Sequence, residues 1–102
     1  MEKLKNKNLS YIIELIKKIK PYLIKKYNVK TIGIFGSYLR NEQQNGSDLD
    51  ILVEFSKPIG LFSFIGIERE ILEKLKRKAD LVMKNTLKHR IGKYIINEAI
   101  LL

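Results

Sequence analysis

The spacing of hydrophobic residues changes several times along this chain, and the order of those changes leaves few folds open to it. Over residues 9–27 an apolar residue recurs every three or four positions, which is typical of an amphipathic helix. Three short runs rich in β-branched residues predict strands, at 30–35, 48–55 and 79–83. Helical spacing returns over 61–77 and again after Thr86. This order predicts an α/β (α+β) domain: a small mixed β-sheet of about three strands flanked by helices.

Two residues mark expected helix boundaries, and one interrupts a helix. Pro21 has no amide hydrogen, so it either kinks the first helix or opens a second short one as its first-turn residue. Asn28 is expected to end this segment. Thr86 is expected to cap the last helix with its hydroxyl group.

Length and composition restrict the class of protein. At 102 residues, positions 1–102 have the length of a single domain. No uninterrupted apolar run reaches the roughly 18 to 20 residues of a membrane span, so we expect no membrane association and a cytoplasmic location. The chain has no cysteine and one histidine, His89. This composition excludes a disulfide scaffold, thiolate zinc and a multi-histidine metal site within one chain.

The net charge of +9 is unevenly distributed. Residues 1–30 carry nine Lys and two Glu, residues 31–55 carry one Arg against four carboxylates, and residues 56–102 add five net positive charges. A basic chain around an acidic segment attracts a polyanion such as a nucleotide, a nucleic acid or an acidic protein. The alternative is that the lysines form only a solvated helix face. Because aromatic residues do not alternate with the lysine runs, binding of nucleic acid is not favoured.

All three Asp residues fall in the predicted strands, although Asp is depleted in strands. Side chains alternate along a strand, so Asp48 and Asp50 share one face with α-carbons about 6.6 Å apart. Like charges at that separation repel, and a hard cation such as Mg²⁺, which prefers oxygen ligands, would relieve the repulsion. Asp80 would complete a carboxylate triad if its strand lay beside theirs. The alternatives are a solvated strand end for the pair and a turn-capping role for Asp80.

A Gly36–Ser37 dipeptide follows the first predicted strand. Glycine lets a backbone approach a ligand closely, and free amides at a helix start attract phosphate. Arg40 either faces the same phosphates or pairs with Glu42 or Glu54. A plain turn is the alternative for the dipeptide, and no P-loop or dinucleotide-binding motif is present in the sequence.

Two segments together carry a resemblance: Gly-Ser-Tyr-Leu-Arg at 36–40 and Ser-Asp-Leu-Asp-Ile-Leu-Val-Glu-Phe at 47–55. They resemble the minimal nucleotidyltransferase (MNT) family of the DNA polymerase β superfamily. The likeness continues downstream, at 61–62 (Leu-Phe), 79–82 (Ala-Asp-Leu-Val) and 97–99 (Asn-Glu-Ala). The sequence departs from the family at Asn41, where Gly is usual, and at His89, where Pro is common.

The resemblance implies a polymerase β-like nucleotidyltransferase fold and an Mg-dependent enzyme that transfers AMP from ATP. Two Mg²⁺ ions are expected. The residues carried over to metal binding and catalysis are Asp48, Asp50 and Asp80, and those carried over to nucleotide binding are Gly36, Ser37, Arg40 and Ser47. Asp80 would also accept the proton of the attacking group.

Proteins that resemble this one are commonly the antitoxin of a two-component system whose toxin is a small helical protein of the HEPN class. The antitoxin adenylylates a toxin tyrosine, so the resemblance implies a HEPN-type partner and a hetero-oligomer. An apolar cluster after the second strand belongs either to the core or to an interface: Phe62, Phe64, Ile65 and Ile67. Two alternative functions stay open, a binding module that masks its partner without catalysis and a nucleotidyltransferase that acts on RNA or a small molecule.

Overall fold

A long amphipathic helix begins the part of the chain that the computed structural model describes. The described residues are 7–40, 42, 48–86 and 89–102. The helix α2 (Lys7–Tyr27) contains Pro21 in its interior, so the segment is one helix and not two. Its buried face includes Ile12, Ile16 and Leu23. Asn28, in the left-handed conformation with φ 60°, ends it as predicted.

Four strands form one mixed sheet in the described residues, in the order β3-β2-β1-β4. They are β1 (Val29–Phe35), β2 (Leu49–Phe55), β3 (Ala79–Met83) and β4 (Ile100–Leu101). β1 is antiparallel to both β2 and β4, whereas β2 and β3 are parallel. The fold class and the first three strands are confirmed. The expected count of about three was one short, because two apolar residues at the end of a helical pattern give no alternation to detect.

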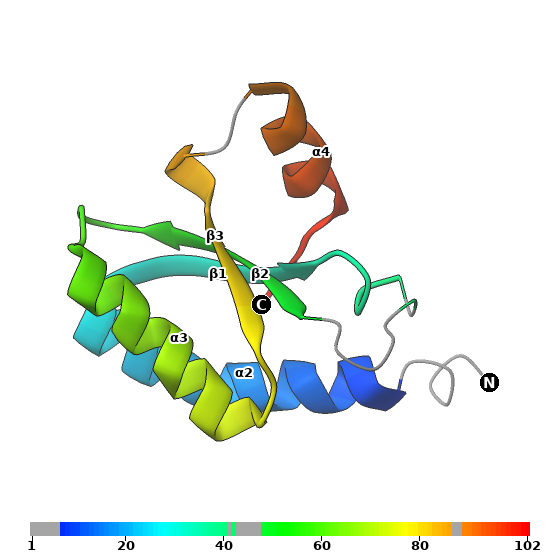
Figure 1. The fold of residues 1–102 in the computed structure, drawn as a ribbon, viewed down its shortest axis with the longest axis horizontal. Helices are drawn as coiled ribbons and strands as arrows, with labels where there is room; N and C mark the ends of the chain where they lie inside the picture. The colour runs from blue at the N-terminus through cyan, green and yellow to red at the C-terminus, as the bar shows by residue number, and fades with distance from the viewer. Residues whose placement is uncertain (1–6, 41, 43–47, 87–88) are drawn as a thin grey trace.

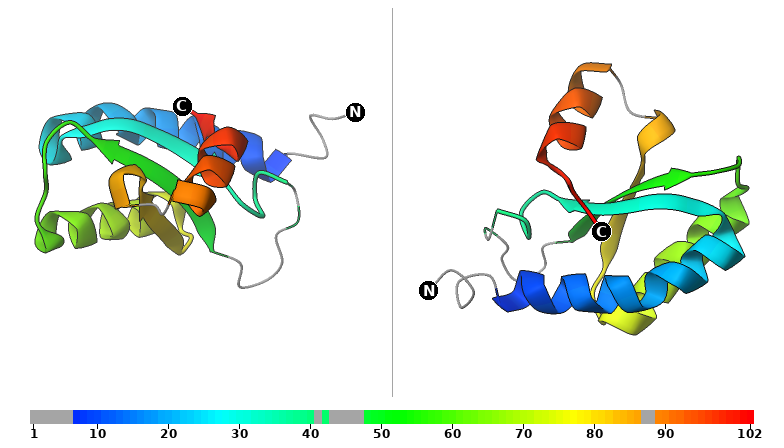
Figure 2. Two further views of the ribbon diagram at one scale, coloured as in Figure 1. Left: turned by 90° about the horizontal axis from the view of Figure 1, so that it is seen from above. Right: turned by 180° about the vertical axis from the view of Figure 1, so that it is seen from behind.

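The helices lie on both sides of this sheet (Figures 1 and 2). α3 (Leu61–Leu75) packs beside α2, and both cover one face of the sheet. The left-handed Lys76 donates its backbone N–H to the Leu72 carbonyl at 2.9 Å, which ends α3 earlier than the predicted Arg77. After β3 come η1 (Lys84–Thr86) and α4 (His89–Glu98), and α4 lies over the opposite face.

Thr86 belongs to η1, and its hydroxyl group donates to the Met83 carbonyl at 3.0 Å. The predicted cap on the last helix depends on residues 87–88, which lie outside the described residues. The apolar cluster at the start of α3 is divided. Ile67 is fully buried and Phe64 packs against the core, whereas the Phe62 side chain is 90% exposed.

Side chains alternate along β2, so its buried core residues and Asp50 lie on opposite faces of the sheet. Leu49, Ile51 and Val53 are buried in the hydrophobic core that α2 and α3 form with the sheet. Asp50, between two of them, therefore points to the other face, on the side of α4. Within the described residues, no helix combines the length and apolar character needed to cross a bilayer.

Replacement of Leu23 should show how much this core contributes to stability. Leu23→Ala removes a fully buried side chain and is expected to lower the free energy of unfolding by about 2–5 kcal/mol. The neighbouring Ile24, 43% exposed, is the matched control, and Ile24→Ala should change stability by less than about 1 kcal/mol. Urea unfolding of both variants measures the difference. Equal losses would contradict the assignment of Leu23 to the core.

Candidate functional site

The carboxylates of Asp50 and Asp80 come together because β2 and β3 are neighbouring parallel strands. Asp50 and Asp80 are direct register partners, and adjacent strands lie about 4.8 Å apart. Asp48, immediately before β2, is half-buried and close enough for its charge to act on Asp50. The predicted adjacency of the two strands is therefore confirmed.

Negative charge is in excess at Asp50. Burial raises the pKa of its carboxyl group above the ordinary value of 3.8, and the charges of Asp80 and Asp48 raise it further. The Arg40 guanidinium and a hydrogen bond from the Ser37 backbone N–H lower the same pKa, but they do not cancel the rise. The ionisation of this one carboxyl group therefore depends on five predicted site residues: Asp50 itself, Asp48, Asp80, Arg40 and Ser37.

Gly36 allows the Asp50 carboxylate to approach the backbone after β1. Gly36 has φ +80°, a conformation that side chains rarely adopt. A Cβ atom there would lie 2.0 Å from Asp50 Oδ2. Glycine is therefore required at position 36 so that the turn after β1 can pack against the Asp50 carboxylate.

The backbone amides of Gly36 and Ser37 both face carboxylates. Gly36 N–H donates to Glu98 Oε2 at 3.3 Å, and Ser37 N–H donates to Asp50. The sequence predicted that these two amides bind phosphate, whereas in the structure they hold the site's own side chains. The partly buried Ser37 hydroxyl group remains the predicted phosphate ligand at this turn.

Arg40 lies on the turn that follows Gly36. Its backbone N–H donates to the Gly36 carbonyl at 3.2 Å, and its guanidinium pairs with Glu98 and with Glu42, the latter at 2.6 Å. The sequence left two pairings open as alternatives to phosphate binding, and the one with Glu42 is present. Glu54 instead accepts from Thr31 Oγ1 at 3.1 Å.

Two further residues complete the comparison with the sequence predictions. Ser47 lies outside the described residues. Glu98, at the end of α4, was not predicted as a site residue. Its only sequence signal was its place in the Asn-Glu-Ala segment at 97–99, which does not indicate a contact with residues some sixty positions earlier.

The carboxylates fit a magnesium site that a nucleotide completes. The described residues contain no group of three or more His, Cys, Asp or Glu side chains arranged to enclose a metal on their own. Mg²⁺ usually binds through one or two carboxylates together with substrate phosphates and water, so a preformed cage is not required. Burial raises the pKa of Asp50, and the charges of Asp80 and Asp48 raise it further, so a cation bound beside these carboxylates would favour the ionised form.

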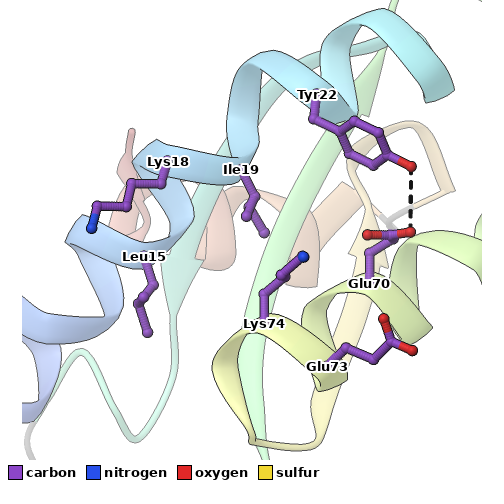
Figure 3. Close-up of a pocket in the computed structure, with 7 residues that line it drawn as sticks. All are labelled: Leu15, Lys18, Ile19, Tyr22, Glu70, Glu73 and Lys74. Atoms are coloured by element: carbon purple, nitrogen blue, oxygen red, sulfur yellow. Dashed lines mark hydrogen bonds between the residues drawn. The ribbon is translucent and has the colours of Figure 1, made fainter.

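A hollow in the surface lies elsewhere, between α2 and α3 (Figure 3). It has a volume of about 590 Å³ and is lined by Leu15, Lys18, Ile19, Tyr22, Glu70, Glu73 and Lys74. Its charged residues are two lysines and two glutamates, and it contains none of the three Asp residues. The site around Asp50 is therefore separate from this groove.

Comparison with known proteins gives matches over most of the chain. Residues 17–102 match the family described as Polymerase beta, Nucleotidyltransferase. A relative from Methanocaldococcus jannaschii is 45% identical over 92 residues, which are 90% of this chain and 94% of the relative. The protein adenylyltransferase MntA of Thermococcus cleftensis is 41% identical over 81 residues, 79% of this chain and 82% of the relative.

The fold also matches solved structures. One is a tri-AMPylated Shewanella oneidensis HEPN toxin in complex with an MNT antitoxin, which aligns with 99% of this chain and 71% of its own, with a TM-score of 0.58. At 17% sequence identity this likeness concerns the fold alone.

Gly36→Ala is expected to destabilise the protein by about 1–3 kcal/mol, because the new methyl group meets Asp50 Oδ2 and the backbone is left-handed. Gly60→Ala is the matched control, since nothing lies within 4 Å of its Cβ position and its φ is −82°. Gly60→Ala should change stability by less than about 1 kcal/mol. Thermal unfolding of the two variants compares them, and an equal effect would argue against close packing of Gly36 on Asp50.

Asp50→Asn is expected to raise the free energy of unfolding near neutral pH. The folded-state pKa of Asp50 lies above the unfolded value, so ionisation is less favourable in the folded protein and stability falls as the pH rises through the folded-state pKa. The gain should disappear only at pH values well below 3.8, the ordinary pKa, where the carboxyl group is protonated in both states. Urea unfolding across this range tests it, with exposed Glu14→Gln as the control. A loss of stability near neutral pH would show that the carboxylate is satisfied.

Proposed function

Because this chain belongs to the polymerase β nucleotidyltransferase family, we propose that it transfers AMP from ATP to a tyrosine of a HEPN-type toxin and so acts as its antitoxin. The observation that carries the chemistry is the register of Asp50 with Asp80, with Asp48 close by. Carboxylates in excess beside a turn that holds Ser37 and Arg40 suit a site for a cation-bound triphosphate.

Asp48, Asp50 and Asp80 would hold two Mg²⁺ ions. Bound there, the ions would neutralise charge on the attacking and leaving oxygens of an in-line displacement. The Ser37 hydroxyl group would donate to the terminal phosphates, and Arg40 would supply positive charge on the same side. Ser47, which precedes Asp48, would add a further hydrogen bond to the nucleotide.

The transfer balances with the residues present. The acceptor tyrosine oxygen forms a bond to the α-phosphorus of ATP, the bond between that phosphorus and the bridging oxygen breaks, and diphosphate leaves. The Asp80 carboxylate accepts the proton of the tyrosine hydroxyl group. Its exposed position on the edge strand β3 lets an acceptor from another chain approach it.

A protein acceptor is favoured by the relatives. The relative from Thermococcus cleftensis is a protein adenylyltransferase by name and is 41% identical. The toxin complex with the same fold gives the class of partner that we propose.

Asp48→Asn with Asp50→Asn should abolish transfer of AMP. The candidate toxin, taken as the product of the gene next to the one that encodes this chain, is incubated with ATP, Mg²⁺ and each variant. Intact-mass spectrometry then detects adenylyl groups added to the toxin. Glu73→Gln, an exposed change on α3, is the matched control and should label its partner like the wild type. Labelling by the double variant would contradict the assignment of the two carboxylates.

Two other outcomes favour other functions. If the partner binds and is neutralised but its mass stays unchanged with the wild-type protein, the chain acts as a stoichiometric binding module. If label from ATP appears on added RNA or on a small molecule and not on protein, the acceptor class is wrong while the nucleotidyltransferase chemistry holds.

A further inference from the structure

The short strand β4 sets the position of Glu98. β4 pairs with β1 in antiparallel register, with Gly33 opposite Leu101 and Ile34 opposite Ile100. Glu98 is the last residue of α4 and lies two positions before β4 begins, so this pairing anchors the end of α4 beside the turn that follows β1. A backbone hydrogen bond from Leu102 N–H to the Ile32 carbonyl, at 2.8 Å, fixes the same register from its other end.

The contacts of Glu98 fit this position. One carboxylate oxygen accepts the Gly36 N–H at 3.3 Å, and the other pairs with the Arg40 guanidinium. A single carboxylate therefore holds both ends of the turn from Gly36 to Arg40. The Glu98 side chain is only 16% exposed, so these interactions are screened less by solvent than an ion pair on the surface.

We propose that Glu98 is a positioning residue for nucleotide binding, which holds the Gly36–Arg40 turn in the conformation that presents Ser37 and Arg40 to the triphosphate. The proposal rests on the proposed function. Glu98 belongs to α4, and the pairing of β4 with β1 keeps the end of α4 beside the site. Under this proposal β4 therefore supports the site although it contributes no side chain to it.

Glu42, the other carboxylate on Arg40, does not share this role. Its side chain is 62% exposed, and its contact with the turn's side chains is the ion pair with Arg40. Exposed pairs of this kind contribute little. Glu42→Gln therefore provides a comparison in which Arg40 loses one partner and Gly36 loses none.

Three variants separate the two contacts of Glu98. Glu98→Gln keeps an oxygen that accepts from Gly36 N–H but loses the charge that pairs with Arg40, whereas Glu98→Ala loses both. We expect the Kd for a non-hydrolysable ATP analogue with Mg²⁺ to rise roughly 10-fold for Glu98→Gln and towards 100-fold for Glu98→Ala, with Glu42→Gln close to the wild type. Because Glu98→Gln acts through Arg40, adding it to Arg40→Gln should weaken binding no further.

A second readout uses the protein without nucleotide. Amide hydrogen exchange, followed by NMR, should be faster at Gly36 in Glu98→Ala but near the wild-type rate in Glu98→Gln. Ile71→Val is the stability control, since it removes a buried methyl group of α3, which covers the other face of the sheet, and should leave nucleotide affinity unchanged.

The outcomes separate this proposal from the proposed function. If Glu98→Ala binds the analogue as the wild type does, Glu98 is not a positioning residue, and the proposal is wrong even where AMP transfer is observed. If Ile71→Val weakens binding as much as Glu98→Ala does, loss of stability explains the effect and the proposal is wrong as well. A wild-type protein that neither binds the analogue nor transfers AMP would overturn the proposed function, and the positioning role with it.

Discussion

Repulsion among carboxylates around Asp50 is the constraint on which the site's other features depend. Two parallel strands place Asp50 and Asp80 side by side, and Asp48 adds a third negative charge. The protein offsets part of this with the Ser37 N–H and the Arg40 guanidinium, but burial, together with the charges of Asp80 and Asp48, still holds the pKa of Asp50 above its ordinary value. A site with residual negative charge is suited to a divalent cation, and hence to a ligand that arrives with one.

The fold makes room for this charge by burying only one face of the sheet with long helices. α2 and α3 cover the apolar side chains of β1 and β2, so the core forms without the acidic face. Within the described residues the acidic face lies on the side of the shorter α4, whose end contributes Glu98 (Figure 1). Gly36 then lets the turn approach Asp50 where any side chain would collide with it. Stability and chemistry thus use alternate residues of the same strand.

Local sequence patterns predicted what local physics determines. The helix over 9–27 and the face of Asp50 follow from hydrophobic spacing, and the strand containing Asp80 was recognised from its apolar neighbours. Pairings between distant segments could be proposed but not established: the adjacency of Asp50 and Asp80 depends on strand order. Glu98 was missed for the same reason, because a two-residue strand gives no periodicity, and the pairing of that strand with β1 brings the end of α4 close to Gly36. The direction of the Gly36 and Ser37 amides likewise depends on which carboxylate lies opposite them.

The distribution of charge links the whole chain to this site. The protein has a net charge of +9, yet its three Asp residues lie together where β2 and β3 begin. The basic surface attracts a polyanion such as ATP, while within the site the carboxylates repel its phosphates. Because the Debye length at physiological salt is about 8 Å, both effects are local: the attraction acts near the basic surface and the repulsion beside the carboxylates. Under the proposed function, a triphosphate without a cation would therefore be drawn to the surface and excluded from the site. Binding of nucleotide and cation would be coupled as a consequence of where the acids lie, and the Glu98-held turn would supply the donors that decide how the phosphates are oriented.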